Sequence, residues 1–405
     1  MNRLTNTIRP YAWGSTTAIP ELLGTAPTGE PQAELWMGAH PGAPSRIDRG
    51  HGPVALDAVI DADPTAELGE AAVKRFGPRL PFLFKVLAAG APLSLQVHPD
   101  LAQAAAGYAE EEARGIPLDA PQRNYKDANH KPEMIVALSP FDGLCGFRRP
   151  AEAADLIDAL GVPTLTPYVD ILRAHPEDRA LREVLAAVLG ADPAAMAETV
   201  RAATEAAARL AATPGTSHAA AYAAYAKAAH SFPGDRGIIA AMLLNHVRLQ
   251  PGEALYLGAG VPHAYLDGLG VEIMANSDNV LRCGLTPKHI DVPELLRIVR
   301  FEAGDPGVLR PEAAPDGEEL YPAPIDEFRL SRYLLAPGAD PRTLPAGTPQ
   351  ILLCTSGEIR LRTVDASSSP AATLTLAQGE SAYVPAGERT ELTGQGTLFR
   401  ATVTA

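Results

Sequence analysis

The sequence predicts a mainly β protein with two small β-barrels and an inserted α-helical subdomain. Three observations support this architecture. Short apolar runs broken by Pro and Gly fill residues 9–142, an Ala-dense stretch with helical spacing follows, and strand-forming sequence returns at Gly252. We expect a discontinuous first barrel domain over residues 1–150 and 233–310, the helical insert over 151–232, and a second barrel over 311–405.

The first region contains three runs that fit buried strands. They are residues 34–38, 81–87 and 133–138, in which aliphatic and aromatic side chains dominate. A helix is expected after Asp100, because its carboxylate can accept N–H groups from the first turn of residues 101–106.

Residues 151–232 predict helices because Leu and Val recur at helical spacing within an Ala-rich background. Plain helix packing is the expected role of this segment. Prolines punctuate it and mark the expected helix boundaries: Pro163, Pro167, Pro176, Pro193 and Pro214.

The segment from Gly258 to His263 reads Gly-Ala-Gly-Val-Pro-His, which is similar to the motif of cupin-type β-barrels, where tight turns bring a histidine inward. We therefore expect both barrels to be cupin-like, that is, jelly rolls. All ten histidines lie at or before His289, so the C-terminal barrel is expected to have no metal site.

Composition excludes several classes of partner. The chain has 405 residues, of which 46% are hydrophobic and 20% charged, as in ordinary soluble proteins. A net charge of −14 argues against a nucleic-acid partner. No apolar run could span a bilayer, and the start lacks an apolar signal region, so we expect a cytoplasmic protein with no membrane partner. We expect a monomer or a weak homo-oligomer, with Cys145, Cys283 and Cys354 as reduced thiols.

A metal site is predicted from Gln96 and His98. They lie two residues apart in a run that reads as a strand, so their side chains point to the same face. A carboxylate and a second imidazole from distant segments, residues 129–133 and 258–265, would complete the nitrogen and oxygen shell that zinc accepts.

Several long motifs, in the right order, resemble type I mannose-6-phosphate isomerases. The resemblance runs from about residue 9 to 300, and it is weak across the helical insert. In that family the metal is held by a glutamine, two histidines and a glutamate, which fall here on Gln96, His98, Glu133 and His263. We therefore expect one Zn²⁺ per chain. The motifs are residues 10–14, 33–41, 94–100, 127–134 and 272–288.

The resemblance implies that mannose 6-phosphate and fructose 6-phosphate are interconverted by proton transfer between C2 and C1 through an enediol. A Lewis acid stabilises the negative charge that develops on oxygen. The expected ligands carry one negative charge, so Zn²⁺ would keep roughly one net positive charge.

The same motifs supply further candidate residues. A general acid/base contributes about 10²–10⁴-fold in rate, and we expect His130 or Lys85 to shuttle the proton. Arg282 is expected to stabilise charge or to bind phosphate, because a guanidinium matches phosphate geometry. The remaining expected substrate contacts are Ser94, Lys131, Lys288, Glu272, Tyr265 and Asp278.

The sequence leaves two alternatives open. An iron cupin dioxygenase would favour three histidines and a carboxylate, and Gln96 argues against it. A non-catalytic cupin that binds a metal and a sugar phosphate would hold its ion without proton exchange at C2.

Overall fold

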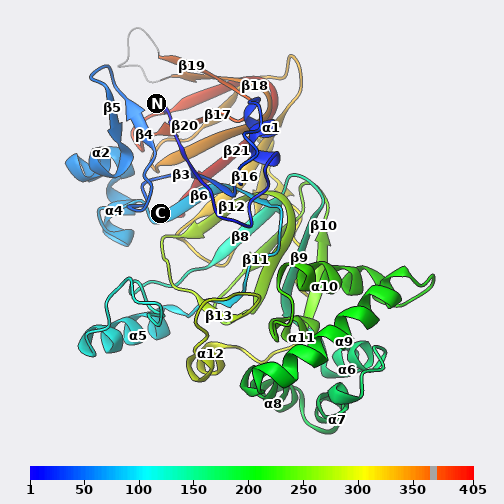
Figure 1. The fold of residues 1–405 in the computed structure, drawn as a ribbon. Coiled ribbons are helices and arrows are strands. Elements are labelled where there is room, and N and C mark those ends of the chain that lie inside the picture. The colour runs from blue at the N-terminus through cyan, green and yellow to red at the C-terminus, as the bar shows by residue number, and fades with distance from the viewer. Residues whose placement is uncertain (365–371) are drawn as a thin grey trace.

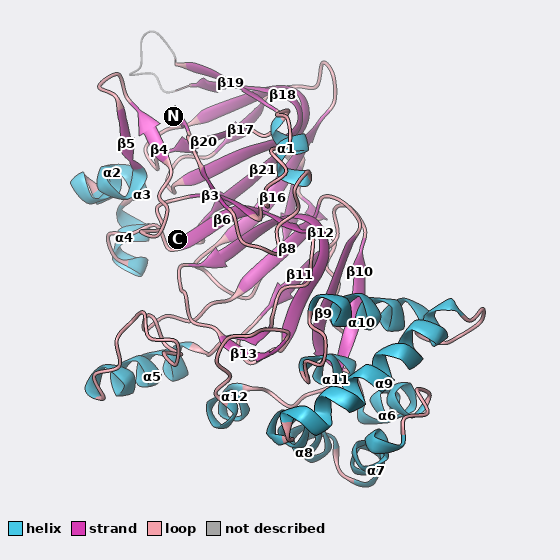
Figure 2. Ribbon diagram, in the orientation of Figure 1, coloured by secondary structure: helices cyan, strands magenta, loops and turns pink. Residues whose placement is uncertain are grey.

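A computed structural model of the chain describes residues 1–364 and 372–405. Within them, the strands form a ten-stranded sheet, a nine-stranded sheet and a two-stranded sheet. Figure 1 shows the two large sheets next to each other, with most helices gathered at the far end of one of them. The architecture is therefore mixed α/β with several sheets, as Figure 2 also shows.

The ten-stranded sheet is organised around the long strand β12, which pairs with four neighbours, β6, β7, β8 and β9. Every ladder in this sheet is antiparallel. The predicted strands of the first region are confirmed as β3, β6 and β8. The strands are β2 Thr7–Arg9, β3 Glu34–Met37, β6 Phe82–Ala89, β7 Leu95–Val97, β8 Glu133–Ala137, β9 Phe141–Phe147, β10 Leu244–Leu249, β11 Ala254–Leu257, β12 His263–Ala275 and β13 Leu281–Gly284.

The nine-stranded sheet is built mostly from the C-terminal part of the chain. Its first strand is an exception, because β1 at the N-terminus pairs with β20. The sheet contains β1 Asn2–Arg3, β14 Glu312–Ala313, β15 Glu318–Tyr321, β16 Arg329–Leu335, β17 Arg342–Leu344, β18 Gln350–Thr363, β19 Thr373–Ala377, β20 Ser381–Val384 and β21 Thr390–Thr402. The separate pair is β4 Arg46–Asp48 with β5 Pro53–Ala55.

The predicted helical segment forms a cluster of helices, several of which start at proline. Pro150, Pro163 and Pro193 occupy first helical positions, where the missing N–H costs nothing. The cluster comprises α6 Pro150–Asp158, a 3₁₀ turn Pro163–Leu165, α7 Thr166–Ala174, α8 Glu177–Gly190, α9 Pro193–Ala212 and α10 Ala219–Ser231. One further helix, α11 Gly237–Met242, lies beyond the predicted end of this segment at residue 232.

The helix predicted after Asp100 is confirmed as α5, Leu101–Ala113. The carboxylate of Asp100 accepts the N–H of Gln103 at 2.7 Å, and the Gln103 side chain accepts the N–H of Asp100, which completes a capping box. The remaining helices are α1 Ala18–Leu23, α2 Leu56–Ala62, α3 Pro64–Leu68, α4 Glu70–Phe76 and α12 Val292–Ile298.

One hydrophobic core joins the two large sheets. It includes Phe84 of β6 and Val271 of β12 together with Leu330 of β16 and Phe399 of β21. Burial of one such side chain stabilises the folded protein by about 1.5–3 kcal/mol, so a core shared by many of them attaches the two sheets firmly to each other. The ten-stranded sheet, which carries the predicted site, thus packs against the C-terminal sheet through this core.

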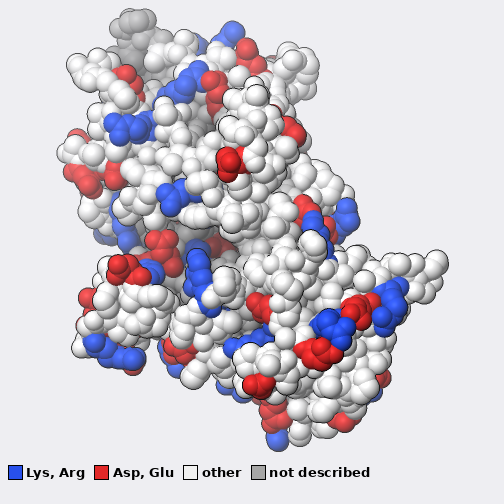
Figure 3. Space-filling model, in the orientation of Figure 1, with Lys and Arg blue, Asp and Glu red and all other residues white. Residues whose placement is uncertain are grey.

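The surface and the cysteines agree with the composition. Lys and Arg side chains are interspersed with Asp and Glu on the described part of the face in Figure 3. All three cysteines are free and buried, which confirms the prediction of reduced thiols. In the described residues, no helix combines the length and the apolar character needed to cross a membrane.

Candidate metal centre

Strand β7 places Gln96 beside two other predicted site residues. Gln96 is the register partner of His263 on β12 and of Arg282 on β13. Side chains at directly opposed positions share one face and have Cβ atoms about 5 Å apart. His98 follows β7 directly, two residues after Gln96. The order of these strands therefore gathers four predicted residues from three separate segments.

Two histidines and one glutamate form a buried cluster. The Oε2 atom of Glu133 lies 3.4 Å from Nε2 of His98 and 3.4 Å from Nε2 of His263. Candidate ligand atoms of all three residues lie within 4.8 Å of one another. In the described part of the chain these three buried atoms have no hydrogen-bond partner. Buried polar atoms are almost always paired, so three clustered atoms of this kind without a partner fit the ligands of a metal ion.

The other ring nitrogen of each histidine is fixed by the backbone. The Nδ1 atom of His98 lies 2.8 Å from the carbonyl oxygen of Asn279, and that of His263 lies 2.9 Å from the carbonyl oxygen of Val261. A ring that donates from Nδ1 presents the lone pair of Nε2, which is the form that binds a metal. The backbone therefore selects the tautomer that the site needs.

The predicted Gly-rich turn brings His263 into this cluster. Gly260 has φ of 76°, a left-handed conformation that glycine adopts without strain. Its N–H donates to the carbonyl oxygen of His98 at 2.8 Å. A Cβ atom at this position would also meet Cγ of Arg300 at 2.5 Å. The turn thus ties the start of β12 to the end of β7 and sets the two histidines side by side.

The shifted pKa values of His98 and Glu133 favour the protonation states in which these side chains bind a metal. Burial lowers the pKa of His98 to about 4, so the ring is neutral near pH 7. Burial alone would raise the pKa of Glu133, but Lys131 and His98 hold it well below its usual value. The Nζ atom of Lys131 lies 2.9 Å from Oε1 of Glu133, which leaves Oε2 for the metal.

Lys85 lies in a buried charge network on the same sheet. Its Nζ atom is 2.8 Å from Glu272 Oε2 and 3.5 Å from Glu34 Oε1. Burial opposes the charge of Lys85, but Glu272 and Glu34 outweigh it and raise its pKa above the ordinary value. The other oxygen of Glu34 accepts the indole N–H of Trp36 at 2.7 Å. Lys85 is therefore a fixed positive charge.

A cation-lined cavity of about 550 Å³ adjoins Gln96. Arg282, Lys288 and Ser94 line it together with Gln96. In residues 1–364 and 372–405, no carboxylate pairs with Arg282 or Lys288. Burial lowers the pKa of Arg282, and burial together with Arg282 lowers that of Lys288. Two unpaired cations beside a metal cluster suit an anionic ligand.

The remaining predicted residues do not line that cavity. Tyr265 is buried, and burial raises its pKa well above the ordinary value. His130 is half-buried and pairs with Glu327 at 2.6 Å. Asp278 is exposed, lies 3.6 Å from His40, and lines a different cavity of about 430 Å³.

Three residues of this neighbourhood received no role from the sequence: Glu34, Asn279 and Glu327. A signal for Glu34 existed, since a lysine inside the apolar run of residues 82–87 requires a buried carboxylate partner. Asn279 lies within the motif of residues 272–288, but its neighbours in the sequence do not indicate which residues it contacts. Glu327 is 197 positions from His130, and no local pattern connects the two.

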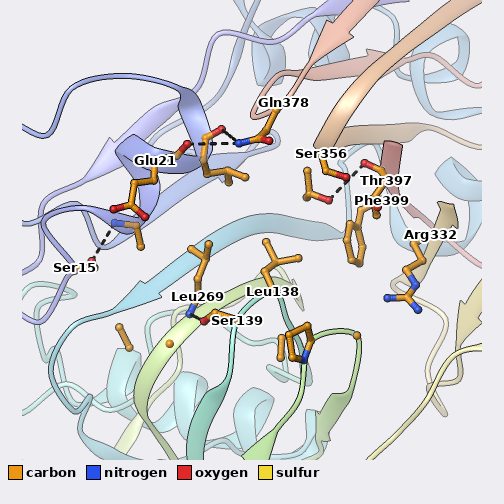
Figure 4. A pocket seen from close by; sticks show the side chains of 18 of the residues that line it. Ser15, Glu21, Leu138, Ser139, Leu269, Arg332, Ser356, Gln378, Thr397 and Phe399 are labelled. Carbon is orange, nitrogen blue, oxygen red and sulfur yellow. Dashed lines mark hydrogen bonds between the residues drawn. The ribbon is translucent and has the colours of Figure 1, made fainter. Parts of the chain in front are cut away.

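A larger cavity, of about 590 Å³, lies where the two large sheets meet (Figure 4). Its labelled residues include Leu269 of β12 in one sheet and Arg332 of β16 and Phe399 of β21 in the other. The guanidinium of Arg332 is already paired with Glu319 at 2.6 Å. The residues of the metal cluster do not line this cavity, so it is a poor candidate for the functional site despite its size.

The sheet, the buried His-Glu-His cluster and the cation-lined cavity together define a metal-binding protein with room for an anionic ligand. Residues 1–150 match the family model described as phosphomannose isomerase type I, catalytic domain. Mannose-6-phosphate isomerase from Escherichia coli (strain K12) is 41% identical over 404 residues, covering 99% of each chain. The Bos taurus protein of the same name is 33% identical over 411 residues, covering 95% of this chain and 93% of that protein.

Solved structures agree over the whole chain. An engineered variant of phosphomannose isomerase from Salmonella typhimurium has a TM-score of 0.90 at 40% identity, with 100% of both chains covered. A zinc-bound mannose 6-phosphate isomerase has a TM-score of 0.88 at 39% identity, covering 100% of this chain and 99% of that one. The chain belongs to the mannose-6-phosphate isomerase family, which confirms the predicted resemblance.

Proposed function

We propose that this chain is a zinc-dependent aldose–ketose isomerase that interconverts D-mannose 6-phosphate and D-fructose 6-phosphate. Membership of the family supports the reaction, and the zinc-bound relative supports the metal. The observation that carries the proposal is the convergence of three buried, unpartnered ligand atoms from His98, Glu133 and His263.

Gln96 is the fourth ligand in this proposal, because it is the cross-strand neighbour of His263. One Zn²⁺ per chain would supply Lewis-acid stabilisation to sugar oxygens that gain negative charge during proton transfer. Neutral histidines and one carboxylate leave about one positive charge on such an ion, whereas a thiolate shell would quench it.

The cations beside the metal cluster take separate roles. Arg282 is the neighbour of Gln96 on β13, so its guanidinium is suited to stabilising charge near the reacting carbons. Lys288 and Ser94 lie in the same cavity and are suited to binding the phosphate group. Glu272 holds Lys85 at 2.8 Å and thereby orients a further positive charge, which is buried.

The proton follows a balanced route. It leaves C2 of the aldose as the C1–C2 enediol forms, while the carbonyl oxygen at C1 takes up a proton. A proton is then delivered to C1, and the hydroxyl at C2 gives up its own proton to become the carbonyl of the ketose. We assign this transfer to His130, an imidazole that lies three residues before the proposed ligand Glu133 and whose Nε2 is held by Glu327 at 2.6 Å. Lys85 is the weaker candidate, because neighbouring carboxylates keep it protonated. Lys131, Tyr265 and Asp278 remain proposed substrate contacts.

The finer architecture belongs to the proposal as well. Two cupin-like barrels, residues 1–150 with 233–310 and residues 311–405, would flank a helical insert over 151–232. The placement of α6 to α10 between residues 150 and 231 supports the insert, and β14 to β21 support the C-terminal barrel. Strand β1 is an exception, because it pairs with β20.

The test is an assay of purified protein for conversion of fructose 6-phosphate to mannose 6-phosphate in D₂O. Activity that is lost with a chelator, returns with zinc, and labels the product with deuterium at C2 supports the proposal. Bound zinc without turnover would favour the non-catalytic alternative. Turnover that persists after complete removal of metal would exclude zinc from the mechanism.

A further inference from the structure

One polar contact connects residues 127–133, which we call the metal-site loop, with the C-terminal part of the chain. The Nε2 atom of His130 lies 2.6 Å from Oε1 of Glu327. Glu327 belongs to the segment between β15 and β16. In the described chain, residues 1–364 and 372–405, no other ion pair or side-chain hydrogen bond links residues 127–133 to residues after 311. Hydrogen bonds to an ionised carboxylate are about twice as strong as those between neutral groups, so this contact can fix the orientation of the His130 ring.

The position of Glu327 is fixed by the contacts of the two residues next to it. The next residue, Phe328, is buried in the core that joins the two large sheets. The preceding residue, Asp326, pairs with Arg75, and its carbonyl oxygen accepts the N–H of Thr404 at 3.0 Å. The hydrogen bond from His130 lowers the pKa of Glu327, so it is a carboxylate at neutral pH.

The residues on either side of His130 are also held in place, and one of them contacts the proposed metal ligand Glu133. The carbonyl oxygen of Asn129 accepts hydrogen bonds from Asn279 at 2.8 Å and from Ser277 at 3.1 Å. On the other side of His130, Lys131 contacts Glu133 at 2.9 Å. The loop is thus held at residue 129 by the β12–β13 connection, at residue 130 by Glu327 and at residue 131 by the proposed metal ligand itself.

We propose that Glu327 is a positioning residue of the active site, supplied by the C-terminal sheet. Its carboxylate accepts the Nε2–H of His130, which leaves Nδ1 as the nitrogen that exchanges protons. Through His130 it also holds the loop that places Lys131 against Glu133. This inference rests on the proposed isomerase function, and it gives the C-terminal sheet a part in the reaction.

The attachment of the sheets does not depend on this contact. The shared core joins them, and the exposed pair of Asp326 with Arg75 lies on the same segment as Glu327. Asp326 therefore provides a matched control: it is a neighbouring carboxylate that anchors the same segment but does not touch the metal-site loop. A role limited to anchoring would make the two carboxylates equivalent.

The experiment compares Glu327→Ala, Glu327→Gln and Asp326→Asn as zinc-loaded enzymes. We expect Glu327→Ala to lower kcat about 10–100-fold, because a positioned general acid/base contributes about 10²–10⁴-fold and this variant removes only its orientation, while KM changes by less than about threefold. Glu327→Gln should recover part of this loss, because its amide oxygen can still accept from His130. Asp326→Asn should keep kcat within about twofold, since it does not contact the loop.

A double-mutant cycle separates positioning from stability. If Glu327 acts through His130, adding Glu327→Ala to His130→Ala should lower kcat no further. Hydrogen–deuterium exchange should also rise in residues 127–131 of Glu327→Ala, but not of Asp326→Asn.

An unchanged kcat in Glu327→Ala overturns the inference, and so does an equal loss in Asp326→Asn or additive losses in the double variant. If the unmodified protein has no isomerase activity, the proposed function itself is overturned. The two failures are therefore distinguishable.

Discussion

The carbonyl oxygen of Asn279 accepts a hydrogen bond from Nδ1 of His98 at 2.8 Å, while its own side chain holds the neighbouring loop. The amide nitrogen of that side chain donates to the carbonyl oxygens of Asp127 and Asn129, both at 2.8 Å. Its amide oxygen accepts the N–H of Lys126 at 2.7 Å. One fully buried residue therefore sets both the orientation of a proposed ligand and the path of the loop that leads to Glu133.

From this arrangement we predict that Asn279→Ala weakens zinc binding. Loss of the side chain frees the loop and shifts the backbone that orients His98, and such partners typically contribute about 10–100-fold to metal affinity. Competition with a chelating dye measures the affinity. Asn276→Ala is the matched control, because Asn276 lies three residues earlier and donates instead to Leu80. Equal zinc affinities in the two variants would contradict this role of Asn279.

A second prediction concerns the buried network around Lys85. Lys85→Met would leave Glu34 and Glu272 without their shared cation inside the protein. Removing one partner from a buried ion pair typically costs about 3–5 kcal/mol. We expect the free energy of unfolding, measured with urea on the metal-free protein, to fall by that amount.

The matched control for Lys85 is the double variant Lys85→Met with Glu272→Gln, which removes one of the uncompensated carboxylates. It should recover part of the lost stability. A Lys85→Met protein as stable as the parent would show that the carboxylates are not held by this lysine, and the fixed charge assigned to it would be withdrawn.

A third prediction separates the two cations of the cavity. Arg282→Ala should retain one zinc per chain and lose mainly kcat, since the guanidinium is placed beside Gln96, close to the proposed metal. Lys288→Ala should raise mainly KM, because a lysine of this cavity in its proposed role would bind the phosphate in substrate and transition state alike.

Binding of inorganic phosphate, measured by isothermal titration calorimetry, provides a readout that needs no turnover. The dissociation constant for phosphate should rise in Lys288→Ala more than in Arg282→Ala. The opposite order would exchange the roles of the two residues, and an unchanged kcat in Arg282→Ala would remove it from the reaction.

The site could be predicted from the sequence where a short motif carries its own geometry. Gln96 and His98 were recognisable because alternate residues of a strand share a face. The convergence of Glu133 and His263 on them depends on β7 and β8 both pairing with β12, and this strand order is not readable from spacing. That part of the prediction came from the resemblance to a family.

Long-range partners could not be predicted in this way. The capping box at Asp100 needs only residues 100–103, and the sequence indicated it correctly. Glu327 and His130 meet only because the C-terminal sheet shares a core with the ten-stranded sheet. The N-terminal strand β1 is a similar case, since its pairing partner β20 lies near the other end of the chain.

A final prediction links zinc to stability. An ion that binds only the folded chain stabilises it by RT ln(1 + [Zn²⁺]/Kd), about 2.7 kcal/mol when free zinc is 100 times Kd. Three buried ligand atoms without partners in the described chain give the folded protein this preference. The thermal midpoint measured by calorimetry should therefore rise with the logarithm of free zinc. In His263→Ala the slope should be much smaller over the same concentrations, because one ligand is missing. Identical slopes in the parent and in His263→Ala would place the stabilising ion elsewhere on the molecule.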